Sequence, residues 1–163
     1  MTRLLGTVPA SIAMAPVQPL WDLSTILNGS FSAVITWRVE ANVQSIQMMV
    51  EASDLFKGDD PSNTEIAPIL LDSSRPVEIT AERANGVNGA NRAVWIGAGT
   101  SINNFPTTRT ETVTYVSSQV GIFSQLVTTR IYYNQQESIK PMGQYGARVK
   151  ITTLIPPPAE AVR

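Results

Sequence analysis

The stretch F-S-A-V-I-T-W-R-V-E-A-N-V, which runs from Phe31 to Val43, decides the fold class. Its odd-numbered residues are all apolar: Phe31, Ala33, Ile35, Trp37, Val39, Ala41 and Val43. The residues between them are polar, apart from Val34. Alternation of this kind is typical of a β-strand that turns one face toward an apolar core. The stretch therefore predicts one long, half-buried strand.

The apolar residues change phase directly after this stretch, because Ile46, Met48, Val50 and Ala52 are even-numbered. A shift by one residue turns every side chain to the other face of a strand, so a bulge or turn near residues 44–45 must absorb it. Two interpretations follow. Either one long strand bends between two sheets, or two strands meet at a corner.

Further short strands are predicted at residues 66–71, 77–81, 94–96, 113–116, 126–133 and 145–155. In the last of these, Tyr145, Ala147, Val149, Ile151 and Ile155 share the inward face with Thr153. We expect Trp37 and Tyr145 to be buried, since each lies on the apolar phase of its strand.

Turn signals separate these strands. Two Asn-Gly dipeptides within residues 85–91 tolerate positive φ and predict a turn. Val116, Val120, Phe123 and Val127 fit a helical spacing, but their β-branched members and Gly121 favour strand and turn. Many short strands joined by turns predict an all-β fold: an Ig-like or jelly-roll-type antiparallel β-sandwich with an extended N-terminal arm.

The length of 163 residues suits one domain with an apolar core. We expect an N-terminal arm and linker at residues 1–28, the β-sandwich domain at residues 29–156, and a short C-terminal tail at residues 157–163.

Composition excludes several kinds of chemistry. The chain has no Cys, which removes disulfides and thiolate sites, and no His, the commonest general base and metal ligand. A Ser-His-Asp triad cannot be built from this chain. The net charge is -1, and Lys and Arg are scattered singly, so nucleic acid is not an expected partner. We expect no enzyme activity, no cofactor and no metal.

The stretch A-V-W-I-G-A-G-T-S-I-N, from Ala93 to Asn103, begins like a dinucleotide-binding motif. Ile102 stands where the third glycine belongs, and Pro106 and a run of Thr follow where a helix is needed. A strand that ends in a glycine turn is the favoured interpretation, and a small-molecule ligand is not expected.

Three other groups of residues are candidate sites. Asp54, Asp59, Asp60 and Asn63 could supply oxygen ligands to calcium, but they lack calcium-loop spacing and stand beside the turn residues Gly58 and Pro61. Glu40 and Glu51 could form a glycosidase pair, but each is on the polar phase of its strand. Trp21, Trp37 and Trp95 could form a sugar platform, although the phase of Trp37 places it in the core.

The N-terminal segment carries the functional hypothesis. Its even positions are mostly apolar: Leu4, Gly6, Val8, Ala10, Ile12 and Met14. Pro9 restricts the segment to a sheet edge or an arm, and Pro16 and Pro19 separate it from the domain. We expect a subunit-contact arm that uses Leu4, Val8, Ala10, Ile12 and Met14, bound by strand addition to a neighbouring subunit. The alternative is that the segment folds back on its own domain.

Gly6, Thr7, Pro9 and Ser11 interrupt the apolar part of this segment, so a cleavable signal is not expected. No run of eighteen apolar residues occurs, and membrane insertion is not expected either.

Two stretches resemble cysteine-free fimbrial (pilin-like) subunits that assemble by donor-strand exchange. A-V-I-T-W-R-V-E-A-N-V-Q-S-I-Q-M-M-V (Ala33 to Val50) resembles their alternating N-terminal strand. P-M-G-Q-Y-G-A-R-V-K-I-T (Pro141 to Thr152) resembles their last strand, which Gly-x-Tyr introduces. The resemblance implies an Ig-like sandwich that self-assembles. The chain departs from the family in lacking a clear secretion signal and in its long apolar arm.

The expected function is a structural subunit that pairs with copies of itself or related subunits, in an extracellular surface filament or a virion. A phage capsid-decoration or tail protein remains open, since it needs no export signal. The rival from another class is a carbohydrate-binding module or adhesin that uses exposed aromatics such as Trp95, Tyr115 and Tyr132.

Overall fold

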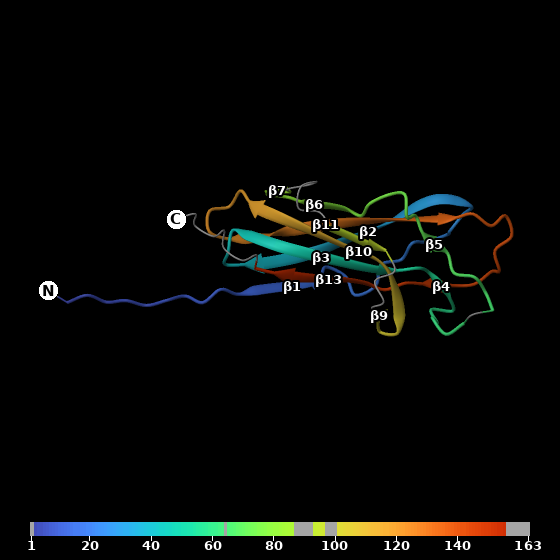
Figure 1. Ribbon diagram of the computed structural model, residues 1–163, viewed down its shortest axis with the longest axis horizontal. Coiled ribbons are helices and arrows are strands. Elements are labelled where there is room, and N and C mark those ends of the chain that lie inside the picture. Colours follow the sequence, from blue (N-terminus) through green and yellow to red (C-terminus); the bar gives the residue numbers. More distant parts are fainter. Residues whose placement is uncertain (1, 64, 87–92, 97–100, 156–163) are drawn as a thin grey trace.

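The regular structure of the described residues consists of β-strands (Figure 1). The computed structural model describes residues 2–63, 65–86, 93–96 and 101–155. Every strand pair among these residues is antiparallel. The all-β, antiparallel fold class expected from the sequence is confirmed.

The first sheet, sheet A, is built on a long pair of strands. β2 (Gly29–Ala41) and β11 (Phe123–Gln135) pair in register along their whole length. β1 (Ile12–Pro16) pairs with the outer edge of β2, and both β5 (Leu70–Leu71) and β6 (Glu78–Ala81) pair with the outer edge of β11.

In the second sheet, sheet B, β3 (Ser45–Ser53) lies between β10 (Phe105–Ser117) and β13 (Val149–Leu154). Three short strands pair with the other edge of β10: β7 (Ala84–Gly86), β8 (Ala93–Ile96) and β9 (Ser101–Ile102). A separate ribbon joins β4 (Phe56–Lys57) to β12 (Tyr145–Gly146).

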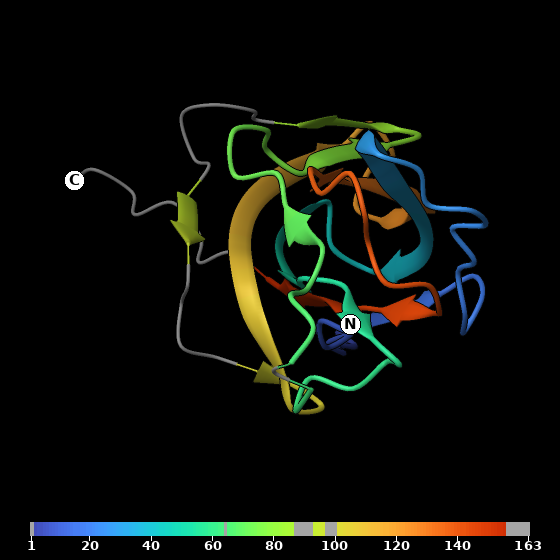
Figure 2. The ribbon, with the colours of Figure 1, turned by 90° about the vertical axis from the view of Figure 1, so that its right-hand side faces the viewer.

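The two sheets curl around one shared interior, as the end view in Figure 2 shows. The turn at residues 42–44 carries the chain from β2 in sheet A to β3 in sheet B. The phase change predicted near residues 44–45 is therefore a corner between two strands. Odd-numbered residues of β2 and even-numbered residues of β3 then face the same core.

Hydrogen bonds across the interior tie the two sheets together. The Tyr133 hydroxyl of sheet A donates to the Ser53 carbonyl of sheet B over 2.9 Å. In the opposite direction, the Tyr115 hydroxyl of sheet B donates to the carbonyl of Ile79 in sheet A. These bonds satisfy hydroxyl groups that burial has removed from water, at positions where an unpaired group would be costly.

The predicted strand at residues 145–155 is in fact two strands, β12 and β13. The Arg148 backbone N–H donates to the side-chain oxygen of Ser53 rather than to a ladder carbonyl, which interrupts regular pairing. Tyr145 is only half-buried, so its expected full burial is wrong, whereas Trp37 is 6% exposed as expected. Ile155, expected on the inward face, is exposed.

Other predicted strands and turns differ from the observed ones in the residues that they include. In the predicted strand at residues 66–71, only β5 and an isolated bridge from Leu55 to Ile69 form, since Pro68 has no N–H for a ladder. Asn85 and Gly86 belong to β7 and not to a turn, while residues 87–92 lie outside the described residues. Residues 118–121 form a turn that ends at Gly121, where φ is +72°, and the helical alternative is wrong.

Candidate functional site

Residues 2–11 form no strand, and all their side chains are exposed. We call this segment the free arm. Leu4 is 91% exposed and Val8 is 83% exposed, while Arg3 is the one charged side chain in the segment. Figure 1 shows the free arm in blue, extending away from both sheets. Apolar side chains held in water in this way are costly, and they gain stability when another surface covers them.

The base of the free arm is fixed by one side chain, Asn42 in the turn after β2. The Asn42 side chain accepts a hydrogen bond from the Ser11 N–H over 2.7 Å and donates one to the Pro9 carbonyl over 2.7 Å. The Asn42 backbone N–H also donates to the Ser11 carbonyl. The direction in which the free arm leaves the domain is therefore set by the β2–β3 corner.

The structure separates the five expected contact residues into two groups. Leu4, Val8 and Ala10 lie in the free arm, whereas Ile12 and Met14 lie in β1. Ile12 and Met14 pack against the core of their own domain. The fold-back alternative thus describes the second group, and subunit contact stays a prediction for the first.

A groove of about 980 Å³ opens on the side of the sandwich. Its lining includes residues 16, 18–26 and 140–149. Ala33, Ile35 and Trp37 of β2 also contribute inward-facing side chains to the lining. The sequence did not predict this groove, because it depends on loops that are far apart in the chain.

One edge of β2 is open beside this groove. β11 pairs with all of β2, but β1 pairs only with Trp37–Ala41, and Val17 adds one hydrogen bond, to the Thr36 carbonyl. Within the described part of the chain, no strand pairs with the second edge of residues 29–35. Backbone groups at such an edge are a template for another extended chain.

Charged side chains around the groove are engaged with neighbours. Arg148 and Asp59 form a bidentate ion pair with N–O distances of 2.8 and 2.9 Å. The hydrogen bond between the Arg148 guanidinium and the Asp59 carboxylate raises the pKa of Arg148. Lys140 donates to the Ala67 carbonyl over 2.6 Å. The Tyr145 hydroxyl donates to the Pro141 carbonyl over 2.7 Å. The groove therefore combines apolar side chains with uncharged polar ones such as Gln18, Gln135 and Gln144.

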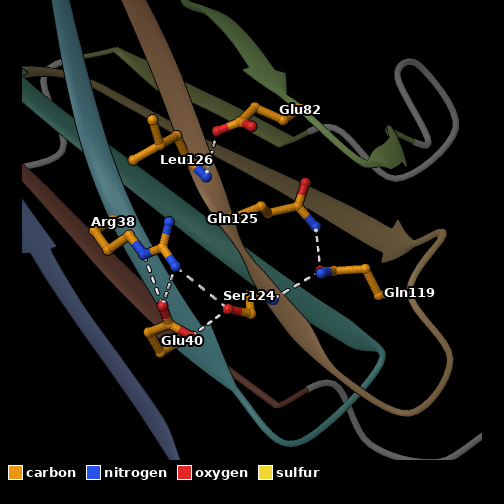
Figure 3. Close-up of polar contacts among 7 residues, drawn as sticks. All are labelled: Arg38, Glu40, Glu82, Gln119, Ser124, Gln125 and Leu126. Carbon is orange, nitrogen blue, oxygen red and sulfur yellow. Dashed lines mark hydrogen bonds and ion pairs between the residues drawn. The ribbon is translucent and has the colours of Figure 1, made fainter.

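Figure 3 shows a polar cluster on the outer face of sheet A, which includes a serine beside a carboxylate. The Ser124 hydroxyl donates to Glu40, and the Arg38 guanidinium donates to the same carboxylate over 2.6 Å. These two bonds, from Ser124 first and then from Arg38, hold the pKa of Glu40 below its usual value. A carboxylate of lowered pKa is a weak base, so the cluster does not activate Ser124 as a nucleophile.

The acidic residues that could supply oxygen ligands to calcium do not form one site. Asp54 accepts a hydrogen bond from the Leu71 N–H, Asp59 pairs with Arg148, and Asp60 accepts from the Ser62 N–H. No group of three acidic side chains suited to a metal ion occurs among the described residues.

The suggested carboxylate pair is not assembled either. Glu40 lies on sheet A and Glu51 on sheet B, so the two do not flank one bond of a substrate. Glu51 is buried, although it is on the polar phase of its strand.

The aromatic residues are also distributed differently from a sugar platform. Trp37 and Tyr115 are buried, so the expectation that Tyr115 is exposed is wrong, and Tyr132 lies under the Arg75 guanidinium at 3.7 Å. Trp21 lines the groove. The side chain of Trp95 and the glycine turn at residues 97–100 lie outside the described residues.

The chain matches no protein-family model, no curated protein and no solved structure. Among the described residues there is no helix of the length and apolarity needed to cross a membrane.

Proposed function

We propose that this chain is a non-enzymatic structural subunit that assembles with copies of itself into a surface filament or a virion. The free arm of one copy binds in the groove of the next, as an added strand along the open edge of β2. No cofactor or metal takes part in this mechanism.

The observation that carries the proposal is that the free arm and the groove lie toward opposite ends of the sandwich. The free arm leaves beside Ala41, which pairs with Ile12, whereas the groove lies beside Ala33, Ile35 and Trp37 and extends toward the start of β2. In Figure 1 the free arm extends from the end that carries the β2–β3 corner. A donor at one end and an acceptor toward the other give a head-to-tail contact, which propagates into an open chain of subunits.

The free arm cannot reach the groove of its own copy unless the chain reverses its direction. β1 already occupies the edge of β2 at Trp37–Ala41, and Asn42 directs the free arm away from that edge. A neighbouring copy supplies the same groove without this obstacle. Ten extended residues span about 33 Å at roughly 3.3 Å per residue, which is longer than the seven unpaired residues of β2.

The chemistry of the two surfaces also agrees. The free arm presents Leu4, Leu5 and Val8 and has little charge, while the groove offers apolar side chains and a row of unpaired backbone groups. Strand addition satisfies the backbone of the arm, and pockets for alternate side chains add specificity. Burial of a Val or Leu contributes about 1.5–3 kcal/mol before the cost of ordering the arm.

The test is the full-length double variant Leu4→Asp/Val8→Asp, which places charges on the apolar side chains of the free arm. We expect it to stay folded and to lose assembly. Light scattering measures the mass, and circular dichroism measures the fold. Ile12 is left unchanged because it packs against its own core.

The matched control is Thr2→Asp/Thr7→Asp, which adds the same two charges at polar positions of the arm and should still assemble. If the Leu4→Asp/Val8→Asp variant assembles like the parent, the arm is not the connector. If that variant unfolds, the arm belongs to its own domain.

A further inference from the structure

The backbone groups on the open edge of β2 follow from its pairing with β1. The Val17 N–H donates to the Thr36 carbonyl, and the Asn42 N–H donates to the Ser11 carbonyl. Both bonds belong to the single register of that strand pair. Because hydrogen-bonded and non-hydrogen-bonded positions alternate in an antiparallel pair, even-numbered residues of β2 point their N–H and C=O groups to the β1 side. On the open stretch these residues are Ser30, Ser32 and Val34.

The open stretch has a defined length. Thr36 is the next residue along β2 that points its backbone groups to this side, and its carbonyl already accepts the Val17 N–H over 2.9 Å. At the other limit, β2 begins at Gly29. The acceptor is therefore the edge of residues 29–35, with three hydrogen-bonding positions.

The free arm is divided by Pro9 into a fixed part and a part that can pair. The Pro9 carbonyl accepts a hydrogen bond from the Asn42 side chain of its own copy over 2.7 Å. Pro9 also has no N–H to donate to a strand edge. Residues 2–8 remain, and this segment has the same number of residues as the open edge, residues 29–35.

The direction of pairing follows from the way the free arm leaves the domain. β1 is antiparallel to β2, so the chain traced from Ser11 back to Thr2 continues in the direction of β2, beyond Ala41 (Figure 1). A second copy placed ahead in the same orientation meets this arm at the start of its own β2. The arm then lies antiparallel to the β2 that accepts it, as β1 does within one copy.

The phase of the added strand follows from its side chains. When the even-numbered residues of the arm face the groove, they lie opposite the odd-numbered residues of β2, which face the core. The other phase would turn Arg3 toward Ala33 and Ile35, and burial of an unpaired charge is costly. Odd-numbered residues of the arm therefore supply the backbone hydrogen bonds, which Pro9 cannot do.

We propose that residues 2–8 of one copy pair antiparallel with residues 29–35 of the next, in the register that places Leu5 opposite Ser32. This inference rests on the proposed function and adds to it the register of the added strand. The hydrogen-bonded pairs are Thr7 with Ser30, Leu5 with Ser32, and Arg3 with Val34. Three inward-facing pairs join a larger residue to a smaller one: Val8 with Gly29, Gly6 with Phe31, and Leu4 with Ala33.

Neighbouring registers lose these contacts. A shift of two residues toward the end of β2 places Pro9 opposite Ser30, where an N–H is required. The opposite shift sets Leu4 against Phe31, whose ring already stacks on Tyr133 with 5.7 Å between the ring centroids. A shift of one residue reverses the phase of every side chain. Pro9 and the sizes of the facing residues therefore select one register.

Thiol exchange reports the register, because the chain contains no cysteine of its own. The probe is a synthetic peptide of residues 2–11 with Leu5→Cys, held as a mixed disulfide with thionitrobenzoate. The acceptors are full-length Leu4→Asp/Val8→Asp chains, whose own arm does not compete, and each carries one further change: Ser30→Cys, Ser32→Cys or Val34→Cys. The acceptor thiolate attacks the peptide sulfur, forms a peptide–protein disulfide and releases the coloured thionitrobenzoate.

We expect exchange at Ser32→Cys to be at least about tenfold faster than at the other two positions. In the proposed register the Cα atoms of residues 5 and 32 are about 5.5 Å apart, which a disulfide can span, whereas residues two positions away lie about 7–8 Å off. A peptide with the other residues in scrambled order gives the background rate by which each rate is divided. Mass spectrometry confirms the linked residues.

Backbone N-methylation tests which residues of the arm bond to β2. N-methylation of Leu5 in the unsubstituted peptide removes an N–H that faces β2, and it should weaken binding about tenfold, the effect of losing one hydrogen bond. N-methylation of Leu4 is the matched control, because its N–H points away from β2, and binding should change by less than about twofold. Fluorescence anisotropy of labelled peptides on the Leu4→Asp/Val8→Asp chain measures both.

Two kinds of result would overturn the inference in distinguishable ways. If exchange is fastest at Ser30→Cys or Val34→Cys, or if the two methylations weaken binding equally, the arm binds in another register and only this inference is lost. If exchange at all three positions is no faster than with the scrambled peptide, the proposed function is lost together with the register.

Discussion

At the scale of single residues, Trp37 is a large side chain of sheet A that is buried in the core. It is 6% exposed and donates to Thr129, which in turn donates to the Ile35 carbonyl. Trp37→Ala removes a large buried ring, and we expect the free energy of unfolding to fall by about 3–5 kcal/mol. Urea denaturation measures this. Val34→Ala, on the outward face of the same strand, is the control and should cost far less; equal melting of Trp37→Ala and the parent would contradict the register of β2.

Gly146 is the second residue for which the structure predicts a clear effect, because its surroundings leave no room for a side chain at this position. A Cβ at this position would lie 1.9 Å from the Asp59 Oδ1 atom, inside the ion pair with Arg148. Gly146→Ala must displace Asp59, and we expect a loss of about 1–3 kcal/mol of stability. Thermal unfolding measures it. Asp59→Gly combined with Gly146→Ala should recover most of the loss, and a double variant no more stable than Gly146→Ala would argue against this contact.

Asp54 links the end of β3 to β5, and it makes stability depend on pH. Burial raises the pKa of its carboxyl, and the Leu71 N–H, which donates to Oδ1 over 2.8 Å, opposes this only in part. Because the folded state prefers the protonated acid, the contribution of Asp54 is full below its unfolded pKa of about 4 and is lost as pH rises through the folded pKa.

Asp54→Asn cannot ionise, so this pH dependence should disappear. We expect the free energy of unfolding of the parent, minus that of Asp54→Asn, to fall as pH rises from about 4 toward neutral. Urea denaturation at several pH values measures the difference. Asp60→Asn is the control of opposite sign, since hydrogen bonds from Ser62 lower the pKa of Asp60 and its contribution is lost as pH falls. A flat difference for Asp54→Asn would contradict the effect of burial.

At the scale of elements, strands were predictable where the alternation is local. The sequence predicts a strand at residues 31–43 and the structure has β2 at Gly29–Ala41, with the same inward face. Alternation reports the direction of each side chain, but not whether a face is covered. Glu51 alternates as expected and is nevertheless buried, and Tyr145 keeps its phase but lies half-exposed at the groove.

The groove was beyond local prediction. Residues 16–26 show no strand alternation, and the groove that they line is also lined by a segment more than a hundred residues later, at residues 140–149. Where β1 ends along β2 decides how much of the edge stays open, and this depends on packing against both sheets. Pro9, in contrast, is a local signal against a central strand, and residues 2–11 form no strand.

At the scale of the whole molecule, the separation of arm and groove makes a prediction about length. The Leu4→Asp/Val8→Asp variant has an intact groove and no working arm, so it can be joined at one end and cannot extend the chain. We therefore expect a small fraction of this variant, mixed with the parent, to shorten assemblies in proportion to its amount. Electron microscopy and sedimentation velocity measure the lengths. Unchanged lengths would indicate a connection that does not use the arm.

The pairing of β2 with β11 has a consequence for the newly made chain. Trp37 and its partner Thr129 are 92 residues apart, so β2 leaves the ribosome long before its neighbour exists. Pairing of such distant segments is intrinsically slow, because a large loop must close before any contact is gained. Until β11 is translated, the backbone edge of β2 that pairs with β11 lacks its partner and is exposed to other nascent chains. The protein is therefore most exposed to aggregation during its own synthesis. Slower translation of the segment after β3 would lengthen this period.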